Sequence, residues 1–182
     1  MSPETAEKLE KVKRYSTSLR RVFGFALAVV GAAMVVYLIM LVVTPGRFGA
    51  PINLIGIEYA GNPLEGTVGI LAHVGILLGL AVLLKFLLHL QKLFGLYAEG
   101  KIFTAEDVRQ IRQIGITLLL FSALWLLGAI EALVVVPSAE TAAHISVRSA
   151  PVGQLILGTI VIVASWIMDV GREMREEQDL VV

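Results

Sequence analysis

The sequence has no cysteine among its 182 residues. This absence excludes disulfide bonds, thiolate metal sites and cysteine nucleophiles. An excess of charge of one sign is absent too, because fifteen basic residues balance fifteen acidic ones. Domains that bind nucleic acid directly usually carry a clear excess of positive charge. We therefore expect no direct binding to nucleic acid.

The sequence also lacks the usual signatures of catalytic sites. HExxH, GxSxG, P-loop and dinucleotide-binding motifs are all missing. The three histidines, His73, His89 and His144, stand in separate segments and do not have the spacing of metal ligands. We therefore predict that the protein is not an enzyme and that it holds no cofactor and no metal.

Hydrophobic residues, by contrast, are abundant, at 57% of the chain. Soluble domains are only about 45–50% apolar. A helix of about 20 apolar residues is long enough to cross the hydrocarbon core of a bilayer. Four blocks reach that length, at residues 22–43, 67–90, 114–136 and 152–170. They predict an all-α membrane protein in which four transmembrane helices form a bundle within the lipid bilayer.

Lysine and arginine are concentrated in three of the segments outside these spans. Cytoplasmic segments of membrane proteins are enriched in these residues. The three segments contain Lys8, Lys11, Lys13, Arg14, Arg20, Arg21, Lys92, Lys101, Arg109, Arg112, Arg172 and Arg175. The other two loops contain only Arg47 and Arg148. We predict cytoplasmic termini and divide the chain into a basic segment (1–21), a transmembrane domain (22–171) and an acidic tail (172–182).

Two of the cytoplasmic segments have helical patterns. Residues 4–20 have the spacing of a basic amphipathic helix, which either grips anionic lipid at the membrane surface or extends the first span into solvent. After the second span, Thr104 is a good N-cap and Asp107 stands at the third helical position, as in a capping box. We predict a helix that begins at Thr104 and continues through Arg109 and Arg112 into the third span.

The two outer loops contain short stretches of strand-like composition. Residues 53–59 lie in the first outer loop, and residues 144–148 alternate apolar and polar side chains in the second. Our hypothesis is that the two stretches pair as a small β-hairpin or sheet over the outer end of the bundle.

Ionisable residues inside the spans are costly unless they pair or reach the interface. His73 and Glu131 stand at similar predicted depths, so we expect an intramembrane pair. That pair is either a proton-sensitive site or a structural clamp between helices. Lys85 and Asp169 are candidates for a second pair nearer the inner side, although a lysine there often extends its ammonium group to the headgroups.

Small residues recur at intervals of four in three of the spans. They are Gly24, Ala28 and Ala32, then Gly75 and Gly79, then Gly128 and Ala132. Such spacing lets helix backbones approach closely, either within one chain or in a homodimer. Trp125 and Trp166 fall inside their spans, and we expect both to fill space between helices.

Two stretches resemble a known family. Residues 100–115, GKIFTAEDVRQIRQIG, resemble the signature of the bacterial DUF2975 membrane proteins, in which a G-x-x-F-[ST] turn leads into an arginine-bearing helix and a span. Residues 171–182, GREMREEQDLVV, are similar to the family's closing pattern of an acidic pair, Asp-Leu and a short apolar end. The resemblance implies a multi-pass protein of the bacterial cytoplasmic (inner) membrane without an assigned activity. Members are often encoded beside a small helix-turn-helix regulator, which implies a cytosolic regulator as partner.

The predicted function is therefore that of a non-enzymatic interaction or regulatory protein. Its cytoplasmic interaction surface is expected to contain Thr104, Asp107, Arg109, Arg112, Glu176, Glu177 and Asp179. The acidic tail either binds a basic cytosolic protein or folds back on Arg109 and Arg112. The alternative function is a small transporter or channel component, with His73 and Glu131 at its polar site.

Overall fold

A computed structural model describes residues 3–43, 66–102, 104–135 and 150–179. Within those residues the chain forms four α-helices and no strand: α1 (Pro3–Val43), α2 (Gly66–Ala98), α3 (Ala105–Val135) and α4 (Ala150–Asp179). All four are long and apolar enough to cross a membrane, which confirms the all-α, multi-pass prediction. The predicted sheet of residues 53–59 and 144–148 lies outside the described residues.

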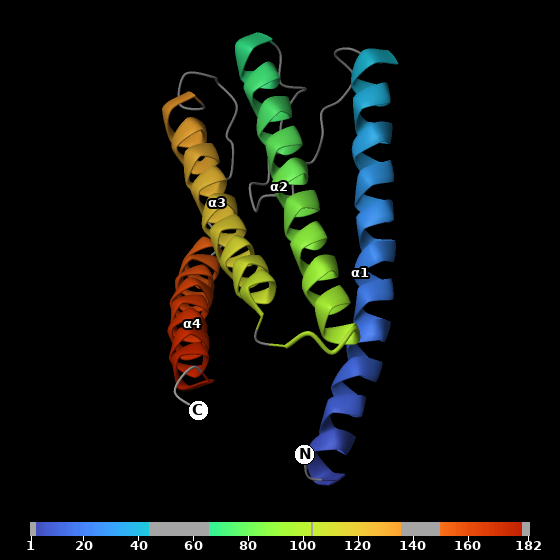
Figure 1. Ribbon diagram of the computed structural model, residues 1–182. Helices are drawn as coiled ribbons and strands as arrows, with labels where there is room; N and C mark the ends of the chain where they lie inside the picture. Colours follow the sequence, from blue (N-terminus) through green and yellow to red (C-terminus); the bar gives the residue numbers. More distant parts are fainter. Residues whose placement is uncertain (1–2, 44–65, 103, 136–149, 180–182) are drawn as a thin grey trace.

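The four helices form an open row (Figure 1). α1 packs against α2, α2 against α3, and α3 against α4, while the described parts of α1 and α4 do not meet. The predicted four-helix bundle is therefore open in the described residues, because its first and last helices do not pack against each other. Lipid removes the hydrophobic drive that would close the row, because an apolar face is as well solvated by acyl chains as by another helix.

The two tryptophans show the consequence of this open arrangement. Trp125 on α3 is 7% exposed and fills space between helices, as expected. Trp166 on α4 is 56% exposed, so the same expectation is wrong for it. Its helix is at the edge of the row and has a neighbour on one side only.

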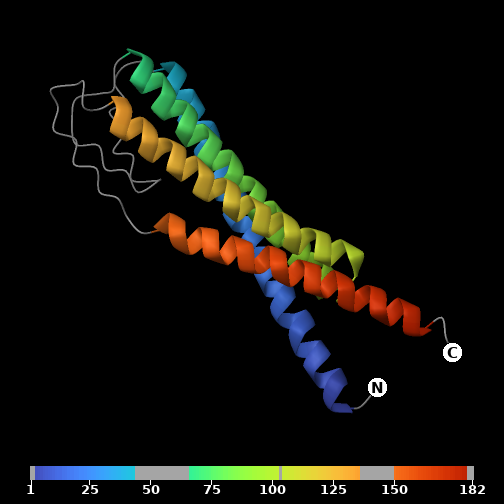
Figure 2. The ribbon, with the colours of Figure 1, turned by 90° about the vertical axis from the view of Figure 1, so that its left-hand side faces the viewer.

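Both termini lie at the same end of the row, which we call the termini end (Figures 1 and 2). α1 has 41 residues and is therefore about 60 Å long, twice what the hydrocarbon core needs. The basic segment is continuous with the first span in one helix. This continuity fits a helical extension of the span, and contact of residues 4–20 with anionic lipid stays a prediction.

The turn between α2 and α3 also lies at the termini end. Gly100 has a φ of 78°, the left-handed conformation that favours glycine. The amide of Gly100 donates to the carbonyl of Tyr97, and the amide of Lys101 donates to that of Leu96. These two bonds are those of a Schellman motif, so Gly100 ends α2 and sends the chain back towards the membrane.

The backbones of α3 and α4 approach each other closely where the two helices cross. A Cβ atom added at Gly115 would lie 2.6 Å from Cγ1 of Ile162 and 3.0 Å from the carbonyl oxygen of Gly158. Between α1 and α2, a Cβ added at Gly24 would lie 2.9 Å from the side-chain nitrogen of Gln91. Gly24 therefore does mark an intramolecular contact, whereas Gly75 has nothing within 4 Å. The homodimer stays a prediction.

Candidate functional site

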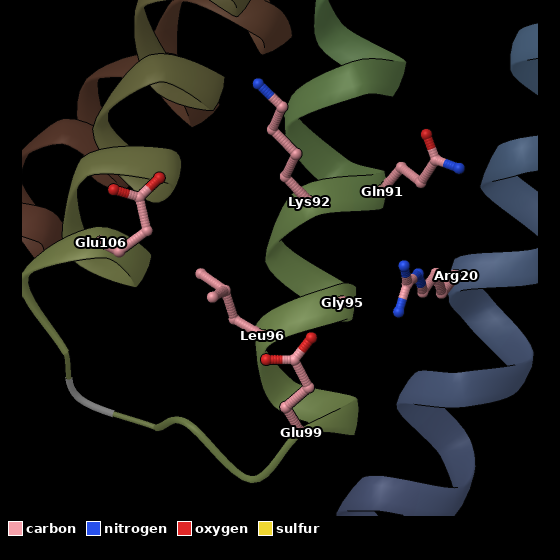
Figure 3. Close-up of a pocket in the computed structure, with 7 residues that line it drawn as sticks. All are labelled: Arg20, Gln91, Lys92, Gly95, Leu96, Glu99 and Glu106. Atoms are coloured by element: carbon pink, nitrogen blue, oxygen red, sulfur yellow. The ribbon is translucent and has the colours of Figure 1, made fainter.

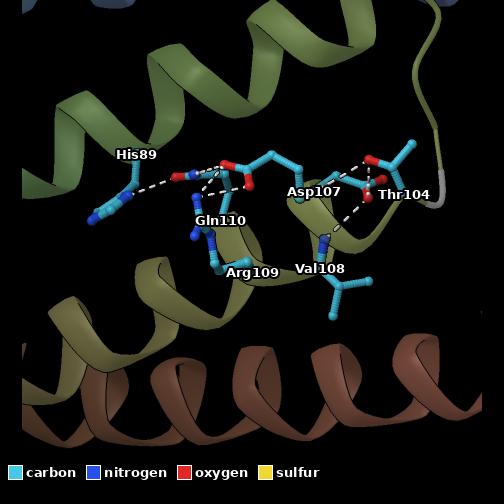
Figure 4. Close-up of polar contacts among 7 residues, drawn as sticks. His89, Thr104, Asp107, Val108, Arg109 and Gln110 are labelled. Atoms are coloured by element: carbon cyan, nitrogen blue, oxygen red, sulfur yellow. Dashed lines mark hydrogen bonds and ion pairs between the residues drawn. The ribbon is translucent and has the colours of Figure 1, made fainter.

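The first turn of α3 is capped by Thr104. The amide of Asp107 donates to the Thr104 hydroxyl oxygen at 3.3 Å, and that hydroxyl donates to Oδ1 of Asp107 at 3.0 Å. The same carboxylate oxygen accepts the amide of Val108 at 3.1 Å (Figure 4). Thr104 is thus the N-cap, as predicted. Asp107 is completely buried, and its carboxylate accepts a hydrogen bond within the first turn of its own helix.

A chain of hydrogen bonds connects α2 to α3 one turn further on. Because an amide oxygen can only accept, the Nδ1–H of His89 donates to Oε1 of Gln110, at 2.7 Å (Figure 4). Nε2 of Gln110 then donates to the Glu106 carboxylate at 2.6 Å, and Arg109 reaches the same carboxylate at 2.8 Å. These bonds join the end of α2 to the start of α3. We call the group of side chains that makes them the polar unit: His89, Thr104, Glu106, Asp107, Arg109 and Gln110.

A triad of charges connects α3 to α4. Asp169 binds Nη2 of Arg112 at 3.1 Å through Oδ2, and Nη2 of Arg172 at 3.3 Å through Oδ1. The side chains are between a quarter and two fifths exposed, so water screens the ion pairs only in part. The triad fixes α4 to α3 at the termini end, beyond the Gly115–Gly158 crossing.

The structure places Asp169 with these arginines rather than with Lys85, the partner proposed from the sequence. Lys85 belongs to α2 and is exposed, and the described parts of α2 and α4 have α3 between them. The ring of His73 lies against that of Tyr37 on α1, with 6.1 Å between their centres. The side chain of Glu131 lies outside the described residues, so the His73–Glu131 pair stays a prediction.

The acidic tail continues α4 as a helix to Asp179 and points away from the start of α3 (Figure 2). Glu173 and Glu177 are exposed, and neither forms an ion pair within 4 Å with a described side chain. Arg109 and Arg112 are bound to Glu106 and Asp169 instead. The described tail residues thus do not fold back. The side chains of Glu176 and Asp179 lie outside the described set.

A pocket of about 390 Å³ opens beside the polar unit, and side chains of α1, α2 and α3 line it (Figure 3). It is lined by Arg20, Gln91, Lys92, Gly95, Leu96, Glu99 and Glu106. Lys101 bonds to Glu99 at 2.9 Å, and this hydrogen bond and charge lower the pKa of the Glu99 carboxyl. In the described part of the chain, no three histidine or acidic side chains are grouped closely enough to hold a metal.

Several of these features were not found from the sequence. No sequence pattern predicted the hydrogen bond between His89 and Gln110. The bond between Glu106 and Gln110 could have been predicted, because these residues have the i, i+4 spacing of neighbours on one helix face. The sequence analysis used Arg172 only to orient the helices in the membrane and did not predict its ion pair with Asp169. The α3–α4 crossing was detectable in principle, because Gly115 and Gly158 are isolated glycines inside apolar helical patterns.

Comparison with known proteins places these features in a family. The family model of DUF2975, described as a protein of unknown function, matches residues 53–182, well over half of the chain. The chain belongs to the DUF2975 family. The match takes in α2, α3, α4 and the polar unit at the termini end, while α1 and Arg20 precede it. No curated protein and no solved structure matches the chain.

Proposed function

We propose that this DUF2975 protein is a non-enzymatic interaction protein of the bacterial cytoplasmic membrane. Its termini end faces the cytoplasm, and its acidic tail binds a basic cytosolic protein, of which a transcription regulator is the leading candidate. The orientation rests on the bias of lysine and arginine towards the termini end. The partner is inferred from the charge and exposure of the tail.

The observation that carries the proposal is that the tail is helical and exposes carboxylates. It continues α4 well past the predicted end of the span at residue 170. Glu173 and Glu177 stand one helical turn apart on the same face, exposed and without an ion pair among the described residues. If the tail served only to pack against the other helices, we would expect these carboxylates to form ion pairs with Arg109 and Arg112.

The Asp169 triad and the polar unit together hold the tail in place, as a docking element requires. The Asp169 triad holds the base of the tail against α3, and the His89–Gln110–Glu106 chain holds α3 against α2. A partner would therefore meet a preorganised surface and would not have to order it on binding. Preorganisation of this kind lowers the entropic cost of association.

The test is made with the full-length protein in its source cells. In-cell cross-linking of an affinity-tagged chain, followed by mass spectrometry, identifies the cytosolic protein bound to the termini end. That protein is then purified, and its Kd for the membrane protein in nanodiscs is measured. We expect Glu173→Gln with Glu177→Gln to weaken binding about 2- to 30-fold at low salt.

The matched control is Glu4→Gln with Glu7→Gln, which removes two exposed carboxylates from α1 at the same end of the row. This control should leave the Kd within twofold. Equal weakening by both double variants would show that only the overall charge matters. Cross-linking that yields no basic cytosolic protein would also contradict the proposal.

A further inference from the structure

The pocket beside the polar unit lies along the end of α2, between Arg20 of α1 and Glu106 of α3. Arg20 reaches towards Gly95 from α1, and Glu106 lies across from it on α3 (Figure 3). The α2 residues in the lining, from Gln91 to Leu96, lie in the last two turns of that helix, and Glu99 follows in the turn after it. Arg20 packs over Gly95, where a Cβ would lie 3.6 Å from the Arg20 Nε, an ordinary contact distance.

The charges in this pocket are not equally neutralised. Glu99 is bound to Lys101 at 2.9 Å, and Glu106 is bound to Arg109 at 2.8 Å. Arg20 and Lys92 have no ion pair within 4 Å among the described side chains. Arg20 also acts on Glu99, and Lys92 on Glu106, but only as secondary influences beside Lys101 and Arg109. Four basic groups therefore surround two carboxylates, and this positive excess suits an anion rather than a cation or a neutral molecule.

An exposed apolar stripe leads along α2 to the pocket. Ile70, Val74, Leu78 and Leu88 are 41% to 66% exposed, and their spacing puts them on the same helix face as Lys92. Lys85 stands on that stripe too, two turns before Lys92, and is exposed. Its ammonium group must extend towards the interface, where headgroup phosphates are found. A ligand that matched both features would join an apolar chain to an anionic group.

We propose that this pocket binds the phosphate headgroup of an anionic phospholipid in the leaflet at the termini end. The phosphate lies between Arg20 and Lys92, and an acyl chain follows the exposed stripe of α2. A lipid with a cationic amine has no advantage here, because Glu99 and Glu106 already have basic partners. The site is distinct from the acidic tail and needs no cytosolic partner.

The experiment measures phospholipid binding by the full-length chain in a neutral detergent, with native mass spectrometry as the readout. Phosphatidylglycerol is titrated against the native chain and against Arg20→Gln with Lys92→Gln. We expect the double variant to bind roughly 30-fold more weakly, about fivefold for each basic residue. Lys8→Gln with Lys11→Gln removes two charges from the same end outside the pocket, and it should change the affinity less than twofold.

Two further titrations identify the source of the phosphate. Phosphatidylcholine should bind the native chain at least about tenfold more weakly than phosphatidylglycerol, and it should be insensitive to the double variant. Inorganic phosphate should not compete with phosphatidylglycerol at millimolar concentration. Equal affinity for the two lipids, or full competition by inorganic phosphate, would overturn the proposal.

A second measurement uses the native chain and does not depend on the folding of any variant. A phosphatidylglycerol with a photoreactive group near its headgroup is incorporated into nanodiscs with the protein. We expect the label on peptides that contain Arg20 and residues 85–99. Labelling that is spread evenly over the termini end, or confined to α4, would overturn the proposal even if the double variant failed to fold.

Discussion

In the α3–α4 pair two backbones meet at Gly115 and Gly158, and a charged triad holds the helices together at one end. The α1–α2 pair is instead joined by side chains. Phe23 stacks on Phe94 with 5.4 Å between ring centres, Gln91 reaches Gly24, and Arg20 lies over Gly95. Contact through side chains leaves room for the pocket at the termini end.

The difference shows how a membrane protein can build a fixed part and an adaptable part without a shared core. Backbone atoms at a helix crossing cannot move without shifting the whole helix. The end of a glutamine or arginine side chain can move by changing rotamer. We therefore expect the α3–α4 pair to be sensitive to substitution and the α1–α2 pair to be tolerant.

The largest effect is expected at the α3–α4 crossing. Gly115→Ala places a methyl group against Ile162 and the Gly158 carbonyl, and it should cost about 1–3 kcal/mol of stability. Gly24→Ala on α1 meets only the flexible end of Gln91, and it should cost less than about 0.5 kcal/mol. Thermal unfolding in detergent measures both. Equal losses would remove the contrast between the two pairs.

A somewhat smaller effect is expected from the charged triad. Asp169→Asn leaves Arg112 and Arg172 without their carboxylate, and it should cost about 1–2 kcal/mol, a value reduced for partial exposure. Glu173→Gln, one turn further along α4, should change stability by less than about 0.5 kcal/mol. Unfolding in denaturant distinguishes the two. If both variants behaved alike, the triad would not be what fixes α4.

The next largest loss of stability is expected at the N-cap of α3. Thr104→Ala removes the hydroxyl that accepts the Asp107 amide, and it should cost about 1 kcal/mol. Thr104→Ser keeps the hydroxyl and should restore most of that loss. Amide hydrogen exchange at residues 105–109 is the measurement. Faster exchange in the alanine variant alone is expected, and equal protection in all three proteins would rule out the cap.

The smallest effect concerns the exposed Glu99–Lys101 pair on the α2 side. The pKa of Glu99 is lowered by its hydrogen bond and ion pair with Lys101. The stabilisation is therefore present above the ordinary glutamate pKa and is lost as pH falls through the lowered one. Lys101→Gln should raise the pKa of Glu99 towards its ordinary value in an NMR titration. An unchanged titration would show that the pair does not form in solution.

Most of the fold followed from the sequence because the bilayer imposes simple rules. Length and apolarity predicted four spans, and Thr104 predicted the start of α3. The helix order in space did not follow, because the apolar faces of a membrane helix do not reveal whether lipid or protein covers them. For that reason the expectation that Trp166 fills space between helices was wrong, and the open arrangement of the helices was not predicted.

The site was predicted less well than the fold. Thr104 is the N-cap, and Arg112 and Asp169 do form ion pairs, but with each other rather than with the tail and Lys85. Pairing between residues 57 positions apart depends on which helices are neighbours, and a single sequence does not give that. The same limit hid the contact between His89 and Gln110.

The central claim is the open row, with α2 and α3 between α1 and α4. Because the chain has no cysteine, pairs of spin labels can be introduced without altering other residues. One pair is placed at Ala33 on α1 and Ile156 on α4, and a control pair at Leu120 on α3 and Ile156, at a similar level of the row. Neighbouring helix axes are about 8–10 Å apart, so the α1–α4 distance should be longer than the α3–α4 distance by about 10 Å or more. Equal distances for the two pairs would show a closed bundle and contradict the account.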